Sequence, residues 1–469
     1  MRAPARGKPG AGGAARPPDP RGLAYRVLMQ GEAGRGANEA LDQALERSAL
    51  DERDRSLVTA LVDGTLRWRA RLDHVLAHYS KYPLADLPTP ILTILRLGAF
   101  QMLCLERVPA SAAVNEAVRL ARRWGHAGTA GLVNALLRRV AEHGTEVPFP
   151  DPEQDPAGYL AVAYSHPRWL VERWLARWGY EDTLALVRVD NEPAPLDLRA
   201  NRLRTSRDGL AALLRAEGVE TAPGALAPDC LQVTAGAAGL RRTRAWAEGM
   251  FSIQGQGSML VGYLASPMPG WKVSDLAAGT GGKATHLAEL MDGRGRVTAY
   301  DKAAARLQVL GREAARLGLE IAAICADATT LPPTGDQDLV LVDAPCSGTG
   351  ALRRRPDARW RKQERQLVEL SALQQALLVA ADGLLHKGGH LIYTTCSLEP
   401  EENEHVVAAF LATHPHFRQE DCRQALPFLP AEVFAEGGRA VRLLPHRHNT
   451  DGMFMVSLRK AEAGSGPRR

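Results

Sequence analysis

From Trp271 onward, short apolar runs alternate with segments of helical periodicity, and this alternation restricts the fold more than any other feature of the chain. The apolar runs predict strands at residues 272–276, 296–300, 321–325, 338–342 and 390–394. Strands separated by helices form right-handed crossovers and align in parallel. We therefore expect an open, doubly wound α/β sheet, Rossmann-like, with a ligand crevice at the carboxyl ends of its strands.

A glycine-rich loop follows the first predicted strand and precedes a helix. It contains Ala277, Ala278, Gly279, Thr280, Gly281, Gly282 and Lys283. Its glycines let the backbone turn tightly and approach a ligand. Asp301 ends the second strand, where an acid receives the hydroxyl pair of a ribose, and Asp327 follows the third strand, where it suits an adenine amino group. Together these features fit S-adenosylmethionine (SAM) better than NAD, although each acid alone also suits a helix N-cap.

Two cysteines follow the fourth and fifth predicted strands. Cys346 stands in the sequence Asp-Ala-Pro-Cys-Ser-Gly and Cys396 in Thr-Thr-Cys-Ser. A crossover places both thiols in one crevice beside Asp343, an arrangement that suits methylation of C5 of a pyrimidine. In that reaction a thiolate attacks C6, and a neighbouring acid such as Asp343 assists at N3. The positive charge of Lys283 would lower the pKa of a nearby thiol, or its side chain would orient the base. The residues alone leave open which thiol attacks, because DNA C5 methyltransferases use a Pro-Cys nucleophile.

The chain before this region has helical periods first and short alternating strands later. We predict a disordered basic tail (1–20), an all-α domain (21–145), a linker (146–160), a small α+β module (161–255), the methyltransferase domain (256–460) and a flexible tail (461–469). Basic residues of the all-α domain and of the module suit an RNA-facing surface, and a solvated face or a compact spacer is the alternative. These residues are Arg119, Arg122, Arg123, Arg138 and Arg139 in the domain, and Arg199, Arg202, Arg204, Arg241, Arg242 and Arg244 in the module.

Composition is that of a globular enzyme. The 469 residues are 45% apolar, the net charge of +5 permits a nucleic-acid partner, and six cysteines in so long a chain do not indicate a disulfide framework. We therefore expect a cytoplasmic protein with no membrane span, no metal and a monomeric state. Outside the two motifs, Cys104, Cys230, Cys325 and Cys422 are interpreted as small buried hydrophobes.

At these motifs the sequence resembles the RNA cytosine-C5 methyltransferases of the RsmB/Sun (Fmu) and NSUN superfamily. Matches are Asp343 to Gly350, Arg355 to Asp357 with Trp360, Thr395 to Ser397 with Glu401 to Asn403, the closing Asp451-Gly452, Gly281 to Lys283 and the strand-end acids. In that family the Cys of Thr-Cys-Ser is the nucleophile and the Cys of Pro-Cys assists product release. The resemblance thus implies that Cys396 attacks and Cys346 releases.

The helical region resembles the NusB-type RNA-binding domain that is fused to RsmB. Matches are Asp54-Arg55, Gly64 to Arg67, Leu95 to Gly98 with Gln101, Val108-Pro109 leading to Val114 to Glu116, and Val133 to Arg138. This resemblance implies 16S ribosomal RNA as the substrate, either free or in a pre-subunit particle. A tRNA cytosine-C5 methyltransferase is one alternative to that assignment.

The sequence departs from the family pattern at three places. Ala277 and Gly279-Thr280 replace residues of the usual Cys-Ala-Ala-Pro-Gly-Gly-Lys loop, Gly255 stands where Asp usually follows Gln254, and Met453 replaces a Phe. Losing the loop proline would loosen cofactor binding, so a ribosome-assembly factor with a vestigial SAM site is a further alternative. Both motif cysteines are present, which favours an active enzyme.

Overall fold

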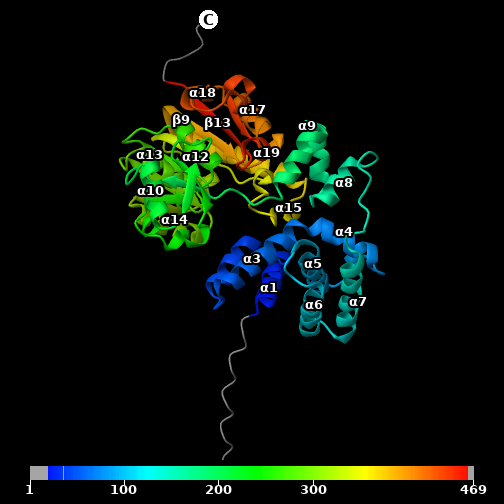
Figure 1. Ribbon diagram of the computed structural model, residues 1–469. Helices are drawn as coiled ribbons and strands as arrows, with labels where there is room; N and C mark the ends of the chain where they lie inside the picture. Colours follow the sequence, from blue (N-terminus) through cyan, green and yellow to red (C-terminus); the bar gives the residue numbers. More distant parts are fainter. Residues whose placement is uncertain (1–18, 35, 463–469) are drawn as a thin grey trace, which may run out of the picture. The chain divides into compact units, whose positions relative to one another are not determined.

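The computed structural model describes residues 19–34 and 36–462 (Figure 1). Nearly all of both predicted tails, 1–20 and 461–469, therefore lies outside the described residues. The chain divides into two compact units, residues 1–165 and 166–469.

The first unit is all-helical, as predicted. Its elements are α1 (Pro20–Glu32), α2 (Ala37–Glu46), α3 (Glu52–Arg67), α4 (Arg69–Tyr79), η1 (Leu84–Asp86), α5 (Thr89–Cys104), α6 (Ala110–Trp124), α7 (Ala127–His143) and α8 (Pro156–Ala163). Aspartates start three of them: Asp19 accepts a hydrogen bond from the Gly22 amide, Asp51 from the Asp54 amide and Asp155 from the Gly158 amide. Such N-caps satisfy amide groups that have no partner within the helix.

Helix α5 packs against α1, α3, α4, α6 and α7 and forms the centre of this unit. A Cβ atom added to Gly64 would lie 1.9 Å from the Phe100 ring, so glycine lets α3 approach α5 closely. Arg96 is buried on α5 and forms a two-pronged ion pair with Asp73 of α4, at 2.7 and 2.8 Å. Two of the family-like motifs in this region, at Gly64 and Arg96, thus hold the helices together.

The segment predicted as a linker, 146–160, runs into α8. Asp155 caps this helix and Pro156 is its first residue, a pair that starts helices because proline fixes the backbone where no amide donor is needed. Helix α8 packs on α4 and buries Leu160 completely. Its residues therefore belong to the first unit.

The second unit opens with α9 (Arg168–Val189) and a small antiparallel sheet with strand order β2-β3-β1-β4. The elements of this module are β1 (Asp197–Ala200), α10 (Arg207–Ala216), β2 (Glu220–Pro223), β3 (Cys230–Ala235), η2 (Ala237–Arg242), α11 (Arg244–Ala247) and β4 (Phe251–Ile253). Alternating side chains of β1 point to opposite faces, and Leu198 and Ala200 join a core that includes Leu210, Leu231 and Phe251. The prediction of a small α+β module is confirmed.

The remaining elements build one large sheet of order β11-β12-β13-β9-β8-β5-β6-β7, with β10 beside β13 (Figure 1). The predicted strands are all present and parallel, as β5 (Lys272–Asp275), β6 (Arg296–Asp301), β7 (Ile321–Cys325), β8 (Gln337–Asp343) and β9 (Leu385–Thr395). The sheet is mixed rather than wholly parallel. Beyond β9 it continues through antiparallel strands that the sequence analysis did not predict: β10 (Phe417–Gln419), β11 (Phe434–Ala435), β12 (Ala440–Leu443) and β13 (Met453–Lys460).

Helices cover both faces of this sheet. They are α12 (Gln256–Ala265), α13 (Gly282–Leu290), α14 (Ala304–Leu317), η3 (Ala328–Thr330), η4 (Thr349–Ala351), α15 (Ala358–Arg361), α16 (Gln366–Leu384), η5 (Pro400–Glu402), α17 (Glu404–Thr413), α18 (Cys422–Ala425), η6 (Ala431–Val433), η7 (Glu436–Gly438) and α19 (Pro445–His448). Leu339 and Leu341 of β8 pack in the core with α12 to α14, whereas Val340 and Val342 pack in the core with α16 and α17. This alternation produces three layers, helix, sheet and helix.

Helix α16 is long and apolar enough to cross a membrane, by length and composition alone, and it is the one such helix in the described part of the chain. It packs against β8 and β9, with Leu377, Leu378 and Ala381 in the core of the sheet domain. The expectation that the sequence contains no such segment is corrected here, and the packing accounts for the apolar run.

Candidate active site

The two motif cysteines meet at the carboxyl ends of β8 and β9. The Sγ atoms of Cys346 and Cys396 lie 3.4 Å apart. Backbone hydrogen bonds hold their loops together: the Ala344 amide donates to the Thr394 carbonyl and the Gly350 amide to the Cys396 carbonyl, each at 2.9 Å. Both thiols are partly exposed. The parallel pairing of neighbouring strands thus brings together two residues that the sequence analysis placed at one edge.

The two thiols differ in their electrostatic surroundings. The hydrogen bond between the two thiols lowers the pKa of Cys396. Burial and the charge of Asp343 oppose this effect, and the positive charges of Arg355 and Lys283 add to it. The same hydrogen bond raises the pKa of Cys346 well above its usual value, and burial and the charge of Glu402 raise it further. The arrangement therefore favours a thiolate at Cys396 and a protonated thiol at Cys346.

A buried carboxylate connects the two cysteine loops. Glu402, which is fully buried, accepts hydrogen bonds from the Ser347 amide at 2.7 Å and the Ser397 hydroxyl at 2.5 Å. It also accepts from the Ser347 hydroxyl and, at 3.1 Å, from the Gln374 amide group. Each serine directly follows one of the cysteines. Glu402 was matched only as part of a family motif, and its acidic neighbours gave no signal that this side chain turns inward.

A second ionisable pair lies beside the thiols. Lys283 Nζ is 2.6 Å from Asp343 Oδ2, so the structure brings these two predicted site residues together. Asp275, at the end of β5, is completely buried, and its Oδ2 has no hydrogen-bond partner within the described residues. Burial, together with the negative charge of Asp343, raises the pKa of Asp275 to about 7. Sequence reasoning passed over Asp275 because its position indicates only the last residue of a strand.

The glycine-rich loop has the backbone that its sequence predicts. Gly279 and Gly281 have positive φ values of 56° and 88°. A Cβ atom on Gly281 would lie 2.4 Å from Leu310, whereas a Cβ on Gly279 would meet nothing within 4 Å, which leaves space for a ligand. Asp301 is nearly buried, accepts from the Gly279 amide at 3.1 Å and from the Ala303 amide at 2.7 Å, and keeps lone pairs on both oxygens.

These groups fit an adenosyl cofactor that carries positive charge. The loop offers open space at Gly279, Asp301 offers acceptors for ribose hydroxyls, and Asp275 adds a buried carboxyl oxygen without a partner among the described residues. Asp327 is different. It caps η3, accepts from the Thr329 amide and hydroxyl and pairs with Lys302, and these hydrogen bonds lower its pKa to about 2. The N-cap that the sequence left as an alternative for Asp327 is present.

The other cysteines lie outside this crevice and are free thiols. Cys230 and Cys422 are buried, as expected of small hydrophobes, and burial raises the pKa of Cys422 to about 11. Cys104 is half-buried. Cys325, at the end of β7, is exposed, which differs from the expectation.

A polar groove runs between α6 and α7 of the first unit. It has a volume of about 590 Å³ and is lined by Asn115, Val118, Arg122, Ala127, Ala130, Gly131, Asn134 and Arg138. Neither Arg122 nor Arg138 forms an ion pair with any residue in the described ranges, whereas Arg119 pairs with Glu116 and Asp19. Arg123 lies over the Trp124 ring at 5.4 Å. The groove therefore presents positive charge beside amide groups.

Three families match successive parts of the sequence. Residues 18–142 match the NusB family, 166–238 the ferredoxin-like domain of RsmF/B-like methyltransferases, and 263–459 the 16S rRNA methyltransferase RsmB/F. A probable ribosomal RNA small subunit methyltransferase B of Bacillus subtilis is 36% identical over 94% of this chain and 98% of its own length. The chain belongs to the RsmB family of ribosomal RNA methyltransferases.

Other relatives agree with this membership. The ribosomal RNA small subunit methyltransferase B of Pseudomonas putida is 34% identical over 96% of this chain and 100% of its own length. The crystal structure of PH0851 matches with a TM-score of 0.80 and 27% identity, over 94% of this chain and 99% of that one. The predicted family and the predicted order of a NusB-like domain, a small module and a methyltransferase domain are confirmed. The protein is an RNA methyltransferase with SAM as its cofactor, and its partner is RNA.

Proposed function

We propose that this protein transfers a methyl group from SAM to C5 of a cytosine in 16S ribosomal RNA, through a covalent bond between Cys396 and C6 of the base. The observation that carries the proposal is the 3.4 Å contact between Cys346 and Cys396 at the carboxyl ends of β8 and β9. Paired thiols beside a lysine–aspartate pair suit C5 chemistry, because this carbon becomes nucleophilic only after addition at C6.

The electrostatic surroundings support Cys396 as the nucleophile. Its lowered pKa increases the fraction of thiolate, which is the attacking form. When the Sγ–C6 bond forms, the π electrons of the C5=C6 bond move onto C5, which becomes nucleophilic and takes up the methyl group. Transfer of the C5 proton to a solvent water then re-forms the C5=C6 double bond and breaks the Sγ–C6 bond, which expels the Cys396 thiolate. Cys346, which lies in contact with this sulfur, assists the release in the proposed scheme.

The Lys283–Asp343 pair suits the proton demand at N3. Addition at C6 places negative charge on the ring nitrogen, and an acid within reach lowers the barrier by donating a proton or hydrogen bond. Asp343 accepts from the Lys283 ammonium, so the pair offers a charged hydrogen-bond donor beside the thiols. When bound, SAM would supply an electrophilic methyl group. The loop residues Ala277 to Gly282 and Asp301 hold the cofactor in this proposal, with Asp327 at the adenine end.

The first unit is proposed to bind the RNA. Arg122 and Arg138 line a groove together with Ala127, Ala130 and Gly131, so small side chains leave room for a phosphate backbone. Arginines that form no ion pair with the described residues suit phosphate contacts, which supply most of the sequence-independent affinity for nucleic acid.

Methyl transfer to defined RNAs tests the proposal. The purified protein should incorporate labelled methyl groups from SAM into 16S RNA, and bisulfite sequencing should place 5-methylcytosine at one site. Free 16S RNA, assembling small subunits and tRNA should be compared at matched concentration, with Cys396→Ala as the inactive control. Methylation of tRNA in preference to 16S RNA would show that tRNA is the substrate. Methylation at any atom other than C5 would overturn the proposed reaction. SAM binding without transfer to any of these RNAs would favour an assembly factor.

A further inference from the structure

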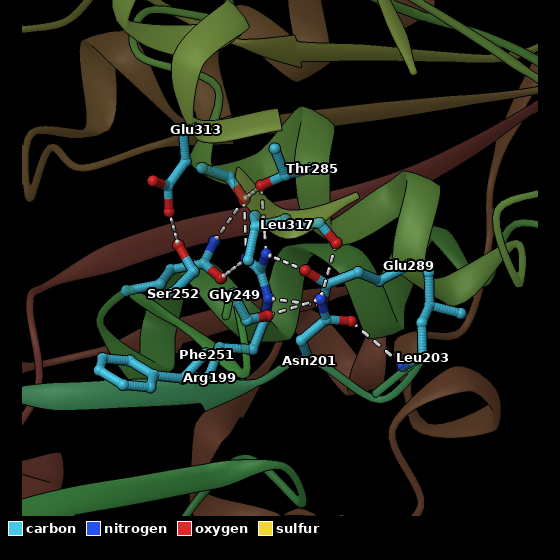
Figure 2. A network of polar contacts seen from close by, with 12 residues as sticks. Arg199, Asn201, Leu203, Gly249, Phe251, Ser252, Thr285, Glu289, Glu313 and Leu317 are labelled. Carbon is cyan, nitrogen blue, oxygen red and sulfur yellow. Dashed lines mark hydrogen bonds and ion pairs between the residues drawn. The ribbon is translucent and has the colours of Figure 1, made fainter. Parts of the chain in front are cut away.

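Arg199 of the small module is completely buried, although it stood among the basic residues expected to line an RNA path. It lies on β1, and its guanidinium points toward α13 of the methyltransferase domain (Figure 2). Its Nε and Nη2 atoms bind the two carboxylate oxygens of Glu289 at 3.0 and 2.7 Å. A guanidinium occupied in this way has no surface to offer to RNA, so the expectation was wrong for this residue.

The same guanidinium reaches the start of α13. Arg199 Nη1 donates to the Gly282 carbonyl at 2.8 Å, and Nη2 donates to the Thr285 hydroxyl at 3.1 Å. Gly282, Thr285 and Glu289 are spaced by three and four residues, which places them on one face of the helix. Arg199 therefore binds the helix from its first residue to a point two turns along.

Gln254 adds to this cluster from the segment that follows β4. Its carbonyl oxygen accepts from Arg199 Nη1, and its amide nitrogen donates to the Gly282 carbonyl at 3.2 Å. The Gly282 carbonyl thus receives donors from Arg199, Gln254 and the Thr285 hydroxyl. Gly282 belongs to the glycine-rich loop, and Lys283, the next residue, is bound to Asp343.

We propose that Arg199, Gln254 and Glu289 are positioning residues for the cofactor loop, so that the small module is a working part of the SAM site. The buried guanidinium holds the first turn of α13, and the loop from Ala277 to Gly281 is covalently joined to that turn. Removing the guanidinium leaves the Glu289 carboxylate buried without its partner and the Gly282 carbonyl without its strongest donor. The loop then samples other conformations, and the affinity for the cofactor falls.

Glu313 and Arg316 form an ion pair within α14, and both side chains hydrogen-bond to the small module, which provides a matched control. Glu313 on α14 pairs with Arg316, whose guanidinium donates to the carbonyls of Trp246 and Phe251 at 2.8 and 2.9 Å. Ser252 donates to Glu313 at 2.9 Å (Figure 2). This pair holds the module against α14, which carries none of the residues of the glycine-rich loop.

The experiment compares Arg199→Lys, Arg199→Met and Arg316→Met in the full chain. Calorimetry should show SAM affinity reduced by about tenfold or more in Arg199→Met. Arg199→Lys should lose less affinity because it keeps a positive charge opposite Glu289, although an ammonium cannot form the two-pronged contact. Arg316→Met should lower the melting temperature but change SAM affinity by less than about twofold. Hydrogen exchange should speed up at residues 279–285 in the Arg199 variants, without the same change in α14.

Two further results bear on the proposal. If Arg199→Met does not fold, Gln254→Ala and Arg199→Lys provide the same comparison, since each removes only part of the cluster. Equal loss of SAM affinity in the Arg199 and Arg316 variants would overturn the proposal, because it would show that the module stabilises the fold without acting on the loop. Unchanged SAM affinity in the Arg199 variants would overturn it as well.

Discussion

The sulfur atoms of Cys346 and Cys396 are 3.4 Å apart although 50 residues separate them in the sequence. One hydrogen bond between them acts on the two thiols in opposite directions, lowering the pKa of Cys396 and raising that of Cys346. This asymmetry separates the roles of two residues that look equivalent in their sequence motifs. It also makes the behaviour of each thiol depend on the other.

Replacing Cys396 by alanine should abolish turnover and the covalent protein–RNA adduct, because Cys396 is the thiol of the crevice whose pKa is lowered. SAM affinity, measured by calorimetry, should stay nearly unchanged, since Cys396 belongs to a different loop from Gly279 and Asp301. A variant that still methylates RNA at a substantial rate would overturn the assignment.

Cys346→Ala should slow release instead of attack. Denaturing gels should show accumulation of a covalent complex with RNA. The reverse pattern, with an adduct in Cys396→Ala and none in Cys346→Ala, would mean that the roles are exchanged.

The same variant has an effect that needs no RNA. Loss of the Cys346 S–H donor should raise the pKa of Cys396, so the pH profile of iodoacetamide alkylation at Cys396 should move to higher pH. Mass spectrometry of the labelled peptide measures it. An unchanged profile would show that Arg355 and Lys283, and not the neighbouring thiol, set the acidity of Cys396.

Asp275 should make stability depend on pH. Burial raises its folded pKa from 3.8 to about 7, so between these values the folded protein binds more protons than the unfolded chain. The free energy of unfolding should therefore fall as pH rises through this range, by an upper bound of about 4 kcal/mol. Asp275→Asn should remove that slope in denaturant titrations of the cofactor-free protein. Parallel pH profiles for the two proteins would contradict the expected burial effect.

Asp301→Ala should weaken SAM binding by about tenfold or more, because charge-assisted hydrogen bonds are worth roughly 1.5–3 kcal/mol each. The substitution also deprives the Gly279 amide of its acceptor. Asp327→Ala is the matched comparison, since Asp327 lies at the next strand end and caps η3. Unchanged SAM affinity in Asp301→Ala would show that Asp301 has a structural role only. A loss of SAM affinity in Asp327→Ala would indicate that Asp327 contacts the adenine as well as capping η3.

Replacing Arg122, Arg123, Arg138 and Arg139 together should weaken RNA binding and flatten its salt dependence. The logarithm of the RNA-binding constant falls linearly with the logarithm of the salt concentration. For every phosphate that an arginine no longer neutralises, the magnitude of this slope should decrease by about 0.7–0.9, while SAM affinity stays constant. Arg119→Gln is the control, because Arg119 is already paired with Glu116 and Asp19. Wild-type affinity and slope in the quadruple variant would show that these arginines only solvate the helices.

Local patterns were enough to predict much of the catalytic domain. Apolar runs between helical segments predicted the ends of β5 to β8 to within one residue, whereas β9 begins at Leu385, five residues before the predicted start at 390. The loop around Gly279 and the positions of Cys346, Cys396 and Asp343 at strand ends followed from the crossover rule. The antiparallel strand β13 was missed, since its pairing with β9 depends on a chain reversal that no nearby residue marks.

Only the tertiary structure decided which charged residues turn inward. In sequence, Arg199 resembles the arginines around it, and Glu402 resembles its neighbour Glu401. Arg199 is buried because Glu289, 90 residues later, supplies its partner, and Glu402 is buried because Ser347 and Gln374 supply hydrogen-bond donors from other elements. A charge leaves water only where such partners compensate its desolvation. The sequence by itself determined the family, the strand order along the chain and the chemistry-bearing motifs, whereas long-range partners determined which side chains hold those motifs in place.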